Sequence, residues 1–283
     1  MRKIIIQDNL LIMVLIMTVL VMLKFPIRPQ SLVYPLVRYT AQVKMNLATR
    51  SMNVYETEHF IIKYDQEDAD VVSMVGQAAE DAYQPVISEL DSTLNRKTLL
   101  IIYPDKEKMN KLFGWSGTQN AMGVYWGGVI QILSPKVWLH ELSAEEFIHS
   151  GPMVHEFTHL VFDHITSGNY PRWFTEGLAQ YVEYKVNGYE WRTADNIIKD
   201  NMYNMNELDD HFDQLDNQAL AYRESLLAVR YIAQVHGEDK LHKVIDKLRH
   251  GYSMKKAIKI ALGLNYMEFE AGWQQWAREN DQH

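Results

Sequence analysis

His155 and His159 lie four residues apart, in the segment His-Glu-Phe-Thr-His. On an α-helix, positions four apart share one face, so both imidazoles can reach the same metal ion. Glu156 lies one residue further round that helix, where a carboxylate can take a proton from a metal-activated water. Ser150 as an N-cap, Pro152 in the first turn and the apolar residues that follow predict a helix at this position.

A catalytic zinc site takes three protein ligands and keeps one position for water, so a third ligand is required. The chain has no cysteine, which leaves His, Asp and Glu as the candidate ligands. The candidate is Glu176, in a second helical segment with 16 residues between it and His159. Gly168 and Pro171 predict a turn that folds the second helix back on the first, and the small Gly177 permits close helix packing.

The two-part pattern of His155 to His159, followed by Trp-Phe-Thr-Glu-Gly-Leu-Ala-Gln-Tyr at 173–181, resembles the gluzincins. These are metallopeptidases whose third zinc ligand is a glutamate. The chain is most similar to the peptidase MA-like family of bacterial membrane-associated proteins, with thermolysin-like and zinc-aminopeptidase enzymes as more distant relatives. The resemblance implies a zinc metallopeptidase in which His155, His159 and Glu176 bind Zn²⁺ and Glu156 is the general base. It also implies a two-lobed zincin fold with a cleft between the lobes.

The resemblance also concerns residues around the metal. Gluzincins stabilise the oxyanion with a Tyr or His on a later helix; Tyr222 is the candidate here, and a core tyrosine is the alternative reading. Asp163, four residues after His159, is expected either to orient a ligand imidazole or to be solvated. Thermolysin-like enzymes have an acid where this chain has Gln180, so that carboxylate is not expected to have a counterpart at this position. Gly123 stands where zinc aminopeptidases hold the substrate amine with an acid, so aminopeptidase activity is not supported.

The remaining pattern predicts an α+β fold, because the strand-like segments come first and the helical ones follow. Strands are expected at 59–64, 98–103, 121–126 and 129–133. The last two are separated by Gly127-Gly128, which predicts a two-residue hairpin. Helices are expected at 67–90 and 106–113, and the chain is helical in pattern from about residue 144 to its end.

A membrane segment is expected at the N-terminus. Arg2 and Lys3 precede an apolar run of 14 residues, Leu10–Leu23, which is about 21 Å long as a helix and shorter than a ~30 Å hydrocarbon core. No Ala-x-Ala-like cleavage site follows this run, which favours an uncleaved signal anchor. We therefore expect a single-pass protein of the cell membrane with its catalytic domain outside the cytoplasm, or a secreted protein if the segment is cleaved.

Three regions follow from this organisation. They are a signal anchor or transmembrane helix at 1–25, a juxtamembrane spacer at 26–54, and a catalytic domain at 55–283. The catalytic domain is expected to consist of an α/β lobe with the active-site helix at 55–166 and a helical lobe at 167–283.

Charge is distributed unevenly along the chain. The first 50 residues hold seven of the 28 basic residues and one of the 36 acidic ones, which leaves 21 basic and 35 acidic residues beyond position 50. An acidic body repels nucleic acid and anionic membrane surfaces, so no nucleic-acid partner is expected. The expected partners are a peptide or protein substrate and, through the N-terminal helix, the membrane; the sequence leaves the oligomeric state open.

The function expected is hydrolysis of peptide bonds by metal-activated water, with endopeptidase activity favoured. Two alternatives use the same metal site: an amide hydrolase acting on cell-wall peptides, and a zinc-bound scaffold without turnover. The presence of Glu156 speaks against the scaffold, because a scaffold has no use for a base beside the metal.

Overall fold

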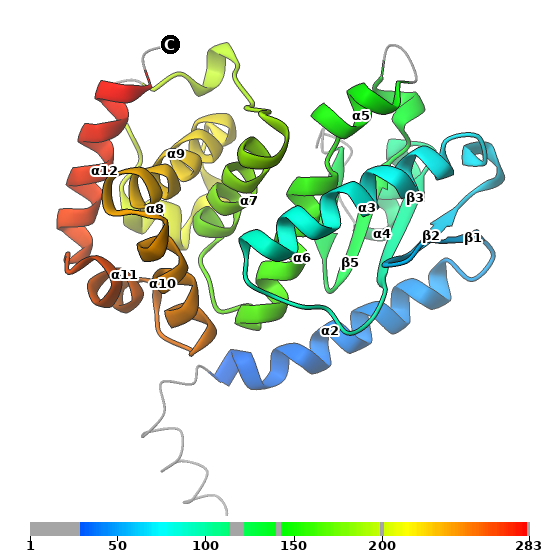
Figure 1. Ribbon diagram of the computed structural model, residues 1–283, viewed down its shortest axis with the longest axis horizontal. Helices are drawn as coiled ribbons and strands as arrows, with labels where there is room; N and C mark the ends of the chain where they lie inside the picture. Colours follow the sequence, from blue (N-terminus) through cyan, green and yellow to red (C-terminus); the bar gives the residue numbers. More distant parts are fainter. Residues whose placement is uncertain (1–28, 114–121, 140–142, 199–200, 282–283) are drawn as a thin grey trace, which may run out of the picture.

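The computed structural model describes residues 29–113, 122–139, 143–198 and 201–281 (Figure 1). The expected signal anchor at 1–25 lies outside these residues. Among the helices of the described part, none has the length and apolar character needed to cross a membrane.

One mixed sheet of five strands forms the first half of the fold. Its spatial order is β1 (Asn53–Glu56), β2 (Phe60–Tyr64), β3 (Thr98–Tyr103), β5 (Val129–Leu133) and β4 (Gly123–Trp126). The three central strands are parallel, whereas β1 and β4 pair antiparallel at the two edges. Every residue of β3 and β5 is buried, because helices cover both faces of the sheet.

Two hydrophobic clusters separate the faces of the sheet. Side chains such as Leu100 and Ile132 point towards α3 (Val72–Glu89) and α6 (Met153–Thr166). The alternate side chains point the other way, towards α2 (Pro29–Ala48) and α4 (Lys106–Phe113). Because alternate side chains of a strand point to opposite faces, one face of the sheet packs against the metal-binding helix and the other packs against α2.

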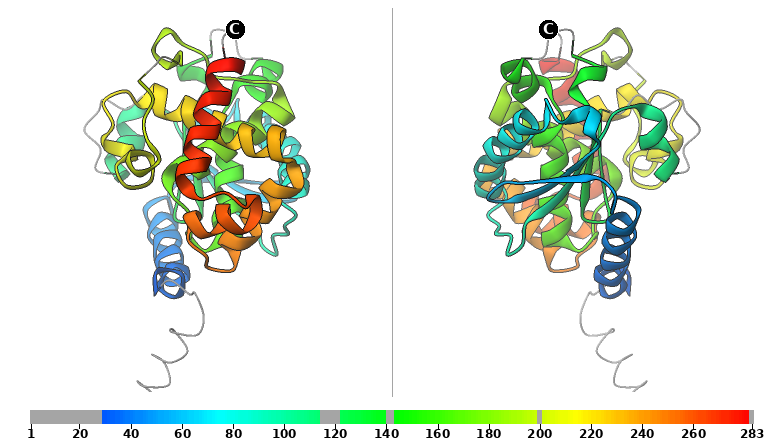
Figure 2. Two further views of the ribbon diagram at one scale, coloured as in Figure 1. Left: turned by 90° about the vertical axis from the view of Figure 1, so that its left-hand side faces the viewer. Right: turned by 90° about the vertical axis from the view of Figure 1, so that its right-hand side faces the viewer.

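The described residues of the second half form helices joined by loops, with no strand among them (Figure 2). A short helix, α5 (Ala144–Ser150), precedes α6. The helices after α6 are α7 (Arg172–Asn187), α8 (Met205–Asp210), α9 (Gln218–Tyr231), α10 (Glu238–Arg249), α11 (Met254–Leu262) and α12 (Tyr266–Asn280). In Figure 1, α7 lies between α6 and α9, so it joins the sheet part of the molecule to the helical part. Short 3-10 helices occupy Gln66–Asp68, Pro135–Val137, Ala194–Asn196 and Phe212–Gln214, and a π-helix occupies Ile232–His236.

The observed α+β architecture confirms the predicted fold class, and all five strands precede the helical second half. Strand β1 was not predicted, and the helix expected at 67–90 is a short 3-10 helix followed by α3. The region expected as a juxtamembrane spacer is largely one helix, α2, which packs against the sheet through Met45. Gly177 permits close helix packing as predicted, but its partner is α9, because an added Cβ would lie 2.2 Å from the carbonyl oxygen of Ser225.

Candidate metal centre

Two helices that lie side by side, α6 and α7, bring three ligand-type side chains together. His155 and His159 lie in the first two turns of α6, and Glu176 lies in the second turn of α7. The Nε2 atom of His155 is 3.3 Å from Oε2 of Glu176, and the Nε2 atom of His159 is 3.4 Å from that same oxygen. One ligand atom from each of the three residues lies within 4.8 Å of the others. The structure thus brings together the three residues that the sequence singled out.

These distances fit a metal ion held between the three atoms. Two ligands that each lie 2.0–2.1 Å from a tetrahedral zinc ion are about 3.3 Å apart. A direct charge-assisted hydrogen bond between an imidazole and a carboxylate would be shorter, at about 2.7–2.9 Å. Burial raises the pKa of Glu176, but Arg172 and His159 outweigh that effect and hold the pKa well below its usual value, so the carboxylate is charged. Two imidazoles and one carboxylate form a donor set that suits zinc.

The opposite nitrogen of each imidazole also has a partner. Nδ1 of His155 is 3.3 Å from Oε2 of Glu183, and Nδ1 of His159 is 2.7 Å from the hydroxyl of Thr175. Burial lowers the pKa of His155, but the neighbouring carboxylates of Glu176 and Glu183 outweigh burial and raise it well above the usual value. These contacts orient both rings so that each Nε2 faces Glu176, which is how proteins position metal-binding histidines.

The sequence reading missed Glu183. It lies seven residues after Glu176, which is about two turns of helix, so both carboxylates lie on the same face of α7. That spacing was the available signal. Gln180 has a different function: its side-chain amide donates to the backbone carbonyls of Glu176 and Tyr222, and it thereby fastens α7 to α9.

Asp163 does not orient a ligand imidazole, and it is not solvated either. It is fully buried and accepts hydrogen bonds from the hydroxyls of Tyr125 at 2.5 Å and Tyr170 at 2.8 Å. The Nε atom of Arg38 lies 3.5 Å from its carboxylate. Both expectations for this residue were therefore wrong: Asp163 links the metal-binding helix to β4 and to α2.

Glu156 lies outside the three-ligand group and against the edge strand β4. A Cβ atom added at Gly123 would come within 2.9 Å of Oε1 of Glu156 and within 2.7 Å of Pro152. Burial raises the pKa of Glu156, whereas the neighbouring His155 and His159 lower it in part. The carboxylate is thus held next to the metal ligands, with a pKa moved from its usual value towards neutrality.

Arg172 connects Glu176 to Tyr222. Its Nη2 atom lies 2.9 Å from Oε1 of Glu176, the carboxylate oxygen that faces away from the histidines. The same guanidinium hydrogen-bonds to the hydroxyl of Tyr222. Burial raises the pKa of Tyr222, and the negative charge of Glu176 adds to this rise. Arg172 therefore links Tyr222 to the metal group. The sequence analysis did not consider Arg172, although it precedes Glu176 by one helical turn.

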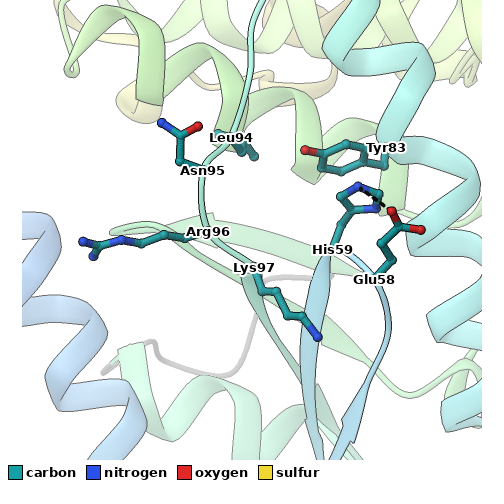
Figure 3. A pocket seen from close by; sticks show the side chains of 7 residues that line it. All are labelled: Glu58, His59, Tyr83, Leu94, Asn95, Arg96 and Lys97. Atoms are coloured by element: carbon teal, nitrogen blue, oxygen red, sulfur yellow. Dashed lines mark ion pairs between the residues drawn. The ribbon is translucent and has the colours of Figure 1, made fainter.

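A separate surface pocket lies near the start of β2 and β3 (Figure 3). The ring of His59 stacks on Tyr83 with 3.6 Å between the ring centroids, and its Nδ1 is 2.6 Å from a carboxylate oxygen of Glu80. Lys97, on the other side of the pocket, donates to Glu56 at 3.0 Å. This pocket shares no residue with the metal group, and its residues Glu58, His59 and Lys97 already have ion-pair partners.

The described residues contain one further group with metal-ligand chemistry, formed by Glu89, Glu238 and His242. The ammonium of Lys185 donates to Glu89 at 2.7 Å and to Glu238 at 3.1 Å. Tyr181 donates to that same oxygen of Glu238. A cation from the protein itself thus already balances these carboxylates, which distinguishes this group from the one at His155.

Comparison with known proteins places the metal group in a family. Residues 143–279 match the family model of the Peptidase MA superfamily. No curated protein matches the chain significantly. Two crystal structures of the M1 zinc metallopeptidase from Deinococcus radiodurans, one of them of a mutant, align with a TM-score of 0.44 at 11% and 10% identity. Each alignment covers 79% of this chain and 50% of the other, so the chain spans half the length of that enzyme. The matched residues include all three ligand positions, so the family match agrees with the resemblance that the metal motif carries.

Proposed function

We propose that the chain is a zinc metallopeptidase that binds Zn²⁺ through His155, His159 and Glu176. One observation carries this proposal: the two Nε2 atoms lie 3.3 and 3.4 Å from one oxygen of Glu176, the spacing of ligands around a tetrahedral zinc ion. The match of residues 143–279 to the family model of the Peptidase MA superfamily also supports it.

The chemistry follows from the residues around that group. Bound zinc would supply Lewis acidity, which lowers the pKa of water and polarises the scissile carbonyl. Glu156 acts as the general base: it takes a proton from the attacking water and later delivers it to the leaving amine. Its raised pKa suits both steps, because the group must accept and release a proton near neutral pH.

Tyr222 stabilises the oxyanion that forms when water attacks the carbonyl. Its hydroxyl accepts a hydrogen bond from Arg172, so its own proton is free to point towards the substrate. Arg172 also holds Glu176 at 2.9 Å, which sets the position of the tyrosine relative to the ligand carboxylate. We propose Arg172 as the residue that positions both side chains.

An endopeptidase suits this site better than an aminopeptidase. In the zinc aminopeptidases that the chain resembles, an acid binds the free amine of the substrate. Here that position is Gly123, and an added side chain would collide with Pro152 and Glu156. A free substrate amine would therefore find no carboxylate at this point of β4. This favours cleavage of internal peptide bonds over removal of N-terminal residues.

We further propose that the enzyme is tethered to the cell membrane by its N-terminal segment and faces outward. The apolar run Leu10–Leu23 follows two basic residues and has no evident cleavage site. The absence of cysteine means that the fold does not depend on the redox state of the compartment.

The proposal is tested by metal analysis and peptide profiling of the full-length protein in detergent. We expect one zinc per chain and cleavage at internal bonds of a broad peptide library, lost on chelation and restored by added zinc. His155→Ala should lose both the metal and the activity. A wild-type protein that holds zinc but cleaves nothing would contradict the peptidase and favour a scaffold. Cleavage confined to cell-wall peptides would favour the amide hydrolase.

A further inference from the structure

The inner face of α2 is firmly docked on the catalytic body. Ala41 and Met45 are 4% and 2% exposed, and Met45 belongs to the second core of the sheet. The side-chain amide of Gln42 donates to the carbonyl of Gly128 at 3.3 Å. Arg38 lies 3.5 Å from the buried Asp163 of the metal-binding helix. These contacts fix the orientation of α2 relative to α6.

The outer face of the same helix carries an exposed apolar stripe. Leu36, Tyr39 and Leu47 are 63%, 63% and 62% exposed, and Val43 is 40% exposed. Their spacing of three and four residues places them on one side of the helix, opposite the docked residues. No side chain of the described part of the chain covers this stripe. Soluble monomeric proteins rarely leave a large contiguous apolar patch exposed to water.

The charge of α2 differs from that of the body behind it. The helix from Pro29 to Ala48 contains no acidic residue, and Lys44 is exposed beside the stripe. Arg50 is exposed just beyond the end of the helix. Beyond position 50, acidic residues outnumber basic ones by 35 to 21. The outer side of α2 therefore has a charge that suits anionic lipid.

The sequence also limits how far α2 can lie from a membrane. Five residues separate Leu23, the end of the apolar run, from Pro29, the first residue of α2. The six residue steps from Leu23 to Pro29 therefore span at most about 22 Å, even when fully extended. If the apolar run lies in the bilayer, α2 must therefore begin close to the headgroups.

We infer that α2 lies on the surface of the lipid bilayer, with Leu36, Tyr39, Val43 and Leu47 inserted among the headgroups and Lys44 facing anionic lipid. This inference rests on the proposed membrane tether but not on the peptidase activity. An interfacial helix buries its apolar face about 5–10 Å into the headgroup region. Because α2 is docked on the sheet and on Asp163, its insertion would hold the metal centre in one orientation relative to the membrane.

The absence of cysteine allows a direct test. Full-length Val43→Cys, labelled with an environment-sensitive nitrobenzoxadiazole dye, is incorporated into vesicles of phosphatidylcholine and phosphatidylglycerol and recovered by flotation. We expect blue-shifted emission that nitroxide-labelled lipids quench. The matched control is Met267→Cys on α12, where the side chain is 82% exposed on another helix; its dye should be neither shifted nor quenched. Adding Leu47→Asp to Val43→Cys should reduce the quenching without changing the circular dichroism spectrum.

The outcomes separate the inference from the proposals on which it rests. A protein that floats with the vesicles while its Val43→Cys dye stays unquenched overturns the interfacial helix and leaves the tether intact. A protein that does not float overturns both. Efficient disulfide cross-linking of Val43→Cys between two chains, without lipid quenching, overturns the inference in favour of a second copy on this face. Zinc content, measured on the same samples, reports on the metal site independently.

Discussion

Oε2 of Glu183 lies 3.3 Å from Nδ1 of His155, while the other nitrogen of that ring lies 3.3 Å from Glu176. Both carboxylates come from α7, so one helix holds the imidazole on its two sides. Thr175, also on α7, holds His159 through Nδ1 at 2.7 Å. The second helix therefore contributes a ligand and also sets the orientation of the two ligands that α6 supplies.

Replacement of Glu183 tests this arrangement. Glu183→Gln keeps the shape of the side chain but removes the charge that orients His155, so we expect zinc affinity to fall about 10- to 100-fold. The measurement is retention of zinc against a graded series of chelators. Glu145→Gln, at an exposed acid of α5, is the control and should bind zinc like the wild type. Equal retention in both variants would remove Glu183 from the metal centre.

Tyr222 is tested by loss of its hydroxyl. Tyr222→Phe should lower kcat by about 100- to 1000-fold, because one oxyanion donor is lost, while zinc content and KM stay close to the wild type. Tyr184→Phe is the control, because Tyr184 is 42% exposed and its ring packs against Arg230 with or without the hydroxyl. An unchanged kcat in Tyr222→Phe would assign Tyr222 to packing alone.

Glu224 gives a pH-dependent prediction away from the metal. It is fully buried, and burial raises its pKa from 4.5 to about 8, although the backbone N–H of Tyr203 opposes the rise. Its stabilising contribution is complete below pH 4.5 and is lost as pH rises towards 8, because the folded state must then hold a buried charge. Glu224→Gln stays neutral and still accepts from Tyr203, so we expect it to exceed the wild type at pH 9 by on the order of 3 kcal/mol.

Urea unfolding of both proteins in detergent, at pH 5 and at pH 9, measures this difference in the free energy of unfolding. At pH 5 the difference should be far smaller, because Glu224 is neutral in the folded state and the pH is close to its usual pKa of 4.5. Parallel stability curves across this range would show that Glu224 does not titrate as described. Glu145→Gln should follow the wild type.

A second stability prediction concerns the buried Arg223. Its side chain is 1% exposed and is paired with Asp281 and Glu190, which joins α9 to the end of α12. Asp281→Asn removes one charge and leaves the guanidinium partly uncompensated, so we expect a loss of about 3 kcal/mol in the free energy of unfolding. Asp239→Asn, whose side chain is 76% exposed, should change stability by less than about 0.5 kcal/mol. A matching small effect at Asp281 would contradict a structural ion pair.

The sequence predicted those parts of the centre that depend on local periodicity. Spacing within one helix places His155 and His159 on one face, and the intervening turn brings Glu176 back to them. Asp163 shows where that reasoning ends. Each step of four residues rotates the side chain by about 40° around the helix, so Asp163 is turned about 80° from His155 and points towards β4 and α2.

Features that depend on contacts between distant elements were not predictable in the same way. Every residue of β1 is exposed, so the strand lacks the apolar alternation that marks a half-buried strand. The roles of Arg172 and Glu183 depend on how α7 is rotated against α6. Many other acidic residues and arginines in the sequence could have made the same contacts, so the sequence alone does not single these two out. The docking of α2 depends on Gln42 and Arg38 meeting Gly128 and Asp163, far along the chain.

The central claim is that Glu156 is the base beside a zinc held by three other residues. The most direct test is Glu156→Gln, with zinc content and peptide hydrolysis measured on the same sample. Because the carboxylate lies outside the ligand group, we expect one zinc per chain as in the wild type, with hydrolysis reduced to background. Hydrolysis at the wild-type rate in this variant, or loss of its zinc, would contradict the account.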